Sequence, residues 1–180
     1  SGPFGPEMRE AVLKADGEIG QLIRTLEEMD LFENTLITVN SDHGMSPFEK
    51  KNVEPDPVHT LKAAGFKIAE NQKQIEPDTE VIVLSMGSRL IYLRKPLSEE
   101  RRALLEGRLR AIKGAQMLGR EELDTLHAHN NRSGDYALVP LPGYTISNAG
   151  DPGGLHGRPA EKFGFLIFHG PGIRKGAMVD

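Results

Sequence analysis

The feature that most constrains the fold is a helical segment that leads directly into a strand near the start of the chain. After Pro6, apolar side chains recur at steps of three and four residues between Val12 and Met29, which predicts one long amphipathic helix. Residues 35–40 (TLITVN) are β-branched and aliphatic with only weak alternation, so they predict a strand covered on both faces. A helix that feeds such a strand is half of an α/β unit.

A second strand of this kind is predicted at residues 163–168, close to the other end of the chain. Between the two strands the pattern changes to shorter elements. We expect a helix at 57–64, a strand at 66–68, a hairpin of 81–84 with 90–93, a helix after Ser98 and a strand at 136–139. The sequence therefore predicts an α/β fold with both strands in one sheet and a small α+β insert between them.

Composition excludes several classes of protein. The 180 residues are 38% hydrophobic and 27% charged, as in folded globular proteins. With 22 basic and 26 acidic residues the net charge is −4, which argues against a nucleic-acid-binding surface. The absence of cysteine excludes disulfides and thiolate metal sites, and no apolar run approaches the roughly 20 residues that span a bilayer. A chain without cysteine occurs on either side of a membrane, so composition assigns no compartment.

Asp42 and His43 stand at the carboxyl end of the first predicted strand. Open α/β sheets bind their ligands beyond the carboxyl ends of strands. A carboxylate and an imidazole at this position can reach one divalent cation if Gly44 lets the chain turn sharply. The same residues also suit an ordinary turn in which Asp42 bonds to its own backbone. The tripeptide alone leaves both interpretations open.

Two stretches of the sequence resemble a known family. The first spans residues 12–45 and ends in Ser41-Asp42-His43-Gly44-Met45, and the second begins with Gly154-Leu155-His156-Gly157 and continues to residue 173. In this order, with an insert between them, they resemble the C-terminal part of the type I phosphodiesterase/nucleotide pyrophosphatase family of the alkaline phosphatase superfamily. The resemblance implies that residues 1–50 and 151–180 belong to a metal-binding α/β/α core sheet. Residues 51–150 would then form an inserted α+β cap subdomain.

The resemblance also implies a hydrolase with two divalent metal ions, most commonly zinc. Asp42 and His43 match the pair that holds the zinc next to the catalytic nucleophile, and His156 matches a ligand of the second zinc. Two metals about 3.5–4 Å apart stabilise the attacking and leaving oxygens of a phosphoryl displacement. The implied substrate is a small phosphodiester, nucleotide or phosphonate.

The threonine or serine nucleophile and the other zinc ligands lie upstream of these stretches in the family, so we expect no catalytic nucleophile here. Because Ser1-Gly2-Pro3 resembles the segment just after the missing ligands, we expect a C-terminal fragment that is inactive alone. Two alternatives stay open. One is another hydrolase of the superfamily, such as a sulfatase, phosphonate hydrolase or phosphoglycerate mutase, and the other is a non-catalytic module that works by binding. Met45 after Gly44 favours the phosphodiesterase branch.

The sequence around the remaining histidines indicates less specific roles for them. His127 and His129 form a His-x-His pair in a polar stretch, for which we expect a solvated loop. His169 ends the second predicted strand, where hydrogen bonding to backbone is the expected role. We expect His59 on the surface of the short helix at 57–64.

Overall fold

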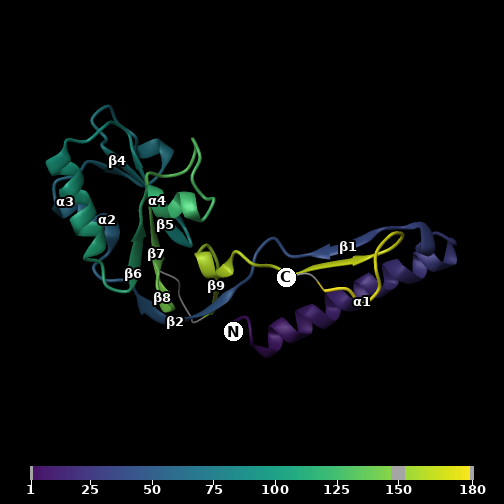
Figure 1. The fold of residues 1–180 in the computed structure, drawn as a ribbon. Helices are drawn as coiled ribbons and strands as arrows, with labels where there is room; N and C mark the ends of the chain where they lie inside the picture. Colours follow the sequence, from purple (N-terminus) through teal and green to yellow (C-terminus); the bar gives the residue numbers. More distant parts are fainter. Residues whose placement is uncertain (1, 147–152, 179–180) are drawn as a thin grey trace.

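A computed structural model describes residues 2–146 and 153–178 of the chain (Figure 1). Its helices are α1 (Pro6–Glu28), α2 (Pro57–Ala63), α3 (Glu99–Arg110) and α4 (Arg120–Thr125), with short 3₁₀ turns at Phe32–Asn34, Gln72–Gln74 and Pro159–Glu161. Its strands are β1 (Ile37–Asn40), β2 (Ser46–Asn52), β3 (Ile68–Ala69), β4 (Val81–Met86), β5 (Ser88–Leu93), β6 (Ala115–Leu118), β7 (Tyr136–Pro140), β8 (Gly143–Thr145), β9 (Gly153–Leu155) and β10 (Leu166–His169).

The strands form three sheets. Five of them make a sheet in the order β3-β4-β5-β7-β6, in which only β3 and β4 run parallel. A three-stranded sheet has the order β8-β2-β9, and β1 pairs with β10 alone. We call residues 57–140, with the five-stranded sheet and helices α2 to α4, the lobe. We call α1, β1 and β10 the arm, which extends away from the lobe (Figure 1).

The main hydrophobic core lies inside the lobe. Helix α3 begins after Ser98, whose hydroxyl accepts a hydrogen bond from the Arg101 N–H at 3.3 Å, as expected of an N-cap. Leu105 and Leu109, four residues apart on α3, are fully buried. They belong to one cluster with residues of α2 and the sheet, including Leu61, Val81, Ile91 and Leu138. The two helices and the hairpin predicted between residues 57 and 110 are thus confirmed, and they enclose this core.

The arm confirms one expectation and corrects another. Strands β1 and β10 pair antiparallel, from Ile37 opposite His169 to Asn40 opposite Leu166, so the two predicted strands do share a sheet. The prediction that they are covered on both faces is wrong for the residues described. All of β10 is exposed, and α1 buries none of its side chains, although Val12, Leu13 and Leu22 give it an apolar stripe. Aliphatic composition predicted burial, but the described residues leave the side chains of β10 and the apolar stripe of α1 largely exposed.

Several elements lie outside the sequence-based expectations. The strand expected at 66–68 forms at Ile68–Ala69, and α4, β2, β6, β8 and β9 were not predicted. Strand β2 reads SPFEKKN and β9 reads GGL, so neither carries the alternation of a half-buried strand. The predicted subdomain boundary at residues 150–151, like Ser1, lies outside the described residues. None of the described helices is both long and apolar enough to cross a bilayer.

Leu105 and Leu104 provide a matched test of the core. Leu105 is fully buried and Leu104, beside it on α3, is 38% exposed. We expect Leu105→Ala to lower the free energy of unfolding by about 2–5 kcal/mol, because it leaves a cavity. Leu104→Ala should cost less than about 1 kcal/mol. Urea denaturation followed by circular dichroism measures both, and equal losses would contradict the assignment of the core.

The ion pair between Glu80 and Arg101 predicts a pH dependence of stability. Hydrogen bonds from the Arg101 guanidinium, at 2.9 and 2.8 Å, lower the pKa of Glu80 against the opposing effect of burial. A carboxylate with a lowered pKa in the folded state stabilises above its unfolded pKa, and that contribution is lost as pH falls through the folded pKa. We therefore expect Glu80→Gln to cost about 1 kcal/mol at pH 7. The difference between variant and wild type should shrink below the ordinary glutamate pKa of 4.5. A difference independent of pH in denaturation experiments would contradict this.

Candidate metal centre

The turn that carries Asp42 and His43 is fixed by the segment leading into β10. Beyond the β1–β10 ladder, the Ser41 N–H donates to the Phe165 carbonyl at 3.1 Å, and the Gly44 N–H donates to the Glu161 carbonyl at 2.7 Å. A Cβ atom on Gly44 would lie 2.7 Å from the Phe163 carbonyl oxygen. Because that approach is closer than real Cβ contacts allow, the turn requires glycine at residue 44.

His156 reaches the same place through the pairing of β2 with β9. These strands run antiparallel, with Ser46 opposite Leu155 and Pro47 opposite Gly154. His156 follows Leu155 directly, so it lies beside the residues that precede Ser46. This register brings His156 to the Asp42–His43 turn although the two histidines are 113 positions apart in sequence.

The two imidazole rings stack on each other. The ring centroids of His43 and His156 are 4.1 Å apart and the ring planes are inclined by 18°. With rings this close, every nitrogen of one histidine lies well within 10 Å of every nitrogen of the other. The structure therefore brings Asp42, His43 and His156 together near the carboxyl end of β1, as the family resemblance implied.

Hydrogen bonding fixes the tautomer of His43. Its Nδ1 lies 2.7 Å from the Gly44 carbonyl oxygen, and since a carbonyl can only accept, Nδ1 carries the proton. In the neutral ring this leaves the lone pair on Nε2, which lies 3.5 Å from an Asp42 carboxylate oxygen. Metal-binding histidines commonly donate the other ring N–H to a carbonyl or carboxylate in this way. A nitrogen lone pair and a carboxylate oxygen that face each other can both bind one cation. A cation between the two atoms would therefore stabilise this arrangement.

The donor set fits a divalent metal but does not complete one site. A carboxylate and two imidazoles are ligand types that zinc prefers. Asp42 and His156 are exposed and His43 is half-buried, so all three are accessible. Within residues 2–146 and 153–178, however, no three His, Asp or Glu side chains converge closely enough to hold a metal by themselves.

A buried ion pair supports both halves of the site. The Arg158 guanidinium donates to Glu161 Oε1 from Nε at 2.9 Å and from Nη2 at 2.6 Å, and the side chains are only 6% and 2% exposed. Burial raises the pKa of Glu161, but hydrogen bonds from Arg158 and Ser46 outweigh it and the pKa is lowered overall. Arg158 follows His156 by two residues, and the Glu161 carbonyl holds Gly44. The sequence analysis missed this pair, for which the Arg-x-x-Glu spacing after His156 was the available signal.

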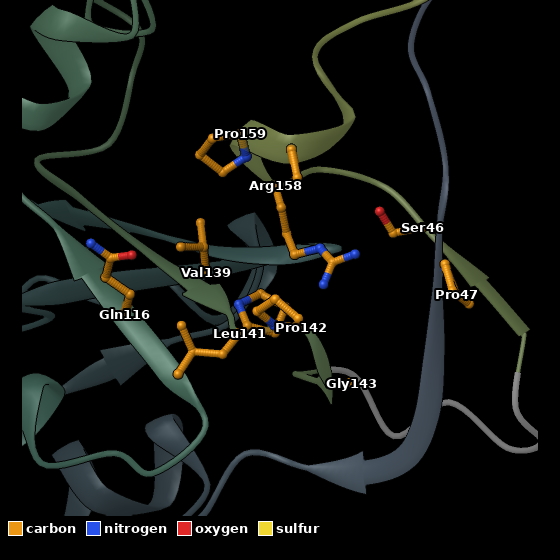
Figure 2. A pocket seen from close by; sticks show the side chains of 11 residues that line it. Ser46, Pro47, Gln116, Val139, Leu141, Pro142, Gly143, Arg158 and Pro159 are labelled. Carbon is orange, nitrogen blue, oxygen red and sulfur yellow. The ribbon is translucent and has the colours of Figure 1, made fainter.

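A cavity of about 550 Å³ adjoins this ion pair (Figure 2). Most of its lining is apolar, and the end of β7 and the segment that joins it to β8 contribute Val139, Leu141 and Pro142. Ser46 and Arg158 contribute polar side chains from the neighbourhood of the candidate site. Because the Arg158 charge is already paired with Glu161, the cavity can accept an apolar group without leaving an unpaired charge.

The other histidines lie apart from these three residues in sequence and in their contacts. His127 and His129 follow α4 in a loop, where His129 Nδ1 is 3.0 Å from an Asp124 carboxylate oxygen. His169 ends β10 and stacks on Phe32 with ring centroids 4.7 Å apart, which is a ring contact that the sequence did not predict. His59 is exposed on α2, as expected.

Comparison with known proteins gives matches of fold and of family. The chain resembles human ectonucleotide pyrophosphatase/phosphodiesterase 5, with a TM-score of 0.66, 20% identity, and coverage of 97% of this chain but 44% of that one. The murine protein gives a TM-score of 0.63, 24% identity, and coverage of 96% and 44%. An inactive form of the murine protein in complex with AMP gives the same values. At these identities the likeness concerns the fold, a mixed α/β structure that matches part of these chains.

No curated protein sequence matches the chain significantly. The family model described as type I phosphodiesterase/nucleotide pyrophosphatase, in contrast, matches residues 1–164. Since this match covers most of the sequence, the chain belongs to the type I phosphodiesterase/nucleotide pyrophosphatase family.

Proposed function

We propose that the chain supplies Asp42, His43 and His156 as ligands of two zinc ions in a hydrolase of phosphodiesters or pyrophosphates. The observation that carries the proposal is the arrangement of His43, whose protonated Nδ1 is held by the Gly44 carbonyl while Nε2 faces Asp42. His156, whose ring stacks on that of His43, would serve a second, neighbouring metal.

Each of the three residues has a distinct part in this proposal. Asp42 and His43 hold the metal beside the nucleophile, and His156 holds the metal beside the leaving oxygen. The metals, when bound, supply Lewis acidity that favours an ionised nucleophile and offsets charge on the departing oxygen. The ion pair of Arg158 with Glu161 keeps the two ligand-bearing segments in register.

The nucleophile belongs, in this proposal, to a part of the protein that the chain does not include. The chain spans 44% of the length of the solved relatives it matches. A threonine or serine on the remaining part would attack phosphorus. The exposed faces of α1 and β10 are suited to pack against that part, as layers of an alkaline-phosphatase-like α/β/α core.

The proposed substrate class rests on the proposed metals and on the space beside the candidate site. We propose a small phosphodiester, nucleotide or phosphonate, in keeping with the AMP bound by the murine relative. Residues 51–150 would form a cap beside the site, and the apolar cavity next to Arg158 offers room for an organic group of the substrate. A non-catalytic binding module is the competing function, and activity measurements separate the two.

We expect Asp42→Asn or His156→Ala in the full-length protein to lower the hydrolysis of bis(4-nitrophenyl) phosphate with added zinc by more than about 100-fold. Changes to outer-shell partners of a metal already cost 10–100-fold, and removal of a ligand should cost at least as much. Release of nitrophenolate measures the rate, and His59→Ala, an exposed histidine on α2, is the control. Full activity in the Asp42 and His156 variants would reject the ligand assignment. A full-length protein inert with all divalent metals would favour the binding module.

The 180-residue chain by itself should show no hydrolysis above the zinc-containing buffer. Catalytic zinc normally has three protein ligands, whereas the proposal places two on one metal and one on the other. The same assay, at equal molar concentrations of the short chain and the full-length protein, tests this. Turnover by the short chain at the full-length rate would place the nucleophile among the present residues.

A further inference from the structure

The tip of the β4–β5 hairpin touches the backbone that carries His156. The Ser88 hydroxyl donates a hydrogen bond to the Gly157 carbonyl at 2.6 Å, and Ser88 is only 3% exposed. This contact joins residues 69 positions apart in sequence. It is a direct link between the lobe and the candidate metal centre.

The hairpin tip and the segment after His156 approach each other so closely that each needs glycine at the contact. Gly87 has φ +74°, and a Cβ atom there would overlap the carbonyl oxygen of His156 itself. Gly157 has φ +102°, and a Cβ atom there would lie 2.9 Å from the Met86 carbonyl oxygen. Because the obstructing atoms are backbone, no rotation of a side chain relieves the overlap. A larger residue at 87 would have to displace the His156 peptide.

The other restraints on the His156 backbone lie on either side of this residue. The β2–β9 ladder ends at Leu155, one residue before it. The Arg158–Glu161 ion pair begins two residues after it, and the His156 side chain is exposed. Between these anchors, the peptide groups of His156 and Gly157 rest against Gly87 and Ser88.

We propose that Gly87 and Ser88 are positioning residues for His156. By fixing the His156–Gly157 backbone, the hairpin sets the stacking of the His156 ring on His43 and hence the separation of the two metals. The part about metals rests on the proposed function, whereas the ring position can be tested without it. The inserted lobe would therefore contribute to metal geometry although none of the proposed ligands lies in it.

The test compares Gly87→Ala and Ser88→Ala with two controls in the full-length protein. Gly65→Ala places alanine at a glycine of the lobe with φ +82° and no atom within 4 Å of the new Cβ, so it reports the backbone strain alone. Ser133→Ala removes a hydroxyl that donates to the Ala128 carbonyl at 2.7 Å, a similar bond within a loop. Ser88→Ala is the mild change that remains informative if Gly87→Ala fails to fold.

The first measurement is the NMR spectrum of carbon-13-labelled histidine without metal. Stacking shifts the ring protons of His43 and His156 upfield of those of exposed His59, and His43→Ala and His156→Ala assign the signals. We expect Gly87→Ala and Ser88→Ala to reduce this upfield shift and both controls to keep it. Unchanged His43 and His156 signals in both hairpin variants would overturn the proposal.

The second measurement is zinc affinity by titration calorimetry, with kcat and KM alongside. We expect the hairpin variants to bind zinc about 10-fold more weakly, as for other outer-shell changes. kcat should fall more than KM changes, and the controls should match wild type. Affinity and kcat equal to the controls would overturn the metal part of the proposal. If the histidine signals move but the wild-type protein neither binds zinc nor hydrolyses phosphodiesters, the hairpin still positions His156 and the proposed function fails instead.

Discussion

The antiparallel pairing of β2 with β9 is the interaction on which the candidate site depends. It is short, three residue pairs long, and one strand contains two consecutive glycines. It nevertheless places the segment before Ser46 beside the segment after Leu155, and the candidate ligands lie on those two segments. Such a ladder contributes little side-chain burial, so its role is to set register rather than to supply stability.

Close backbone approaches around the site explain why such a short ladder is sufficient. Gly44 fits against Phe163, Gly164 against Ser41, and Gly87 against His156, each with less room than a Cβ atom requires. Glycine is entropically costly to order, but it lets main-chain carbonyls and N–H groups meet directly. The buried pair of Arg158 and Glu161 adds a rigid connection between the same segments. The site is thus held mainly by backbone contacts and one ion pair.

The sequence predicted the parts of the fold that have a strong local signature. The helix after Pro6, the hairpin with its turn at Gly87 and the helix capped by Ser98 all follow from periodicity and capping, which depend on neighbouring residues. The convergence of Asp42, His43 and His156 came from the family resemblance instead. Strands β2 and β9 and the Arg158–Glu161 pair escaped prediction, because their existence depends on partners distant in sequence. The exposure of β10 escaped prediction for the opposite reason. Its composition indicates burial, which residues 2–146 and 153–178 do not provide.

The long separation between β1 and β10 has a consequence for the order of folding. The lobe is built mostly from pairings between neighbours in sequence, such as β4 with β5, whereas Ile37 pairs with His169 across the whole lobe. Contacts between distant residues form late, since the entropy of closing the intervening loop must be lost before they stabilise anything. A lobe that folds first shortens that loop to the distance between its two ends. The lobe thereby acts as an internal scaffold that brings the two halves of the candidate metal centre within reach of each other.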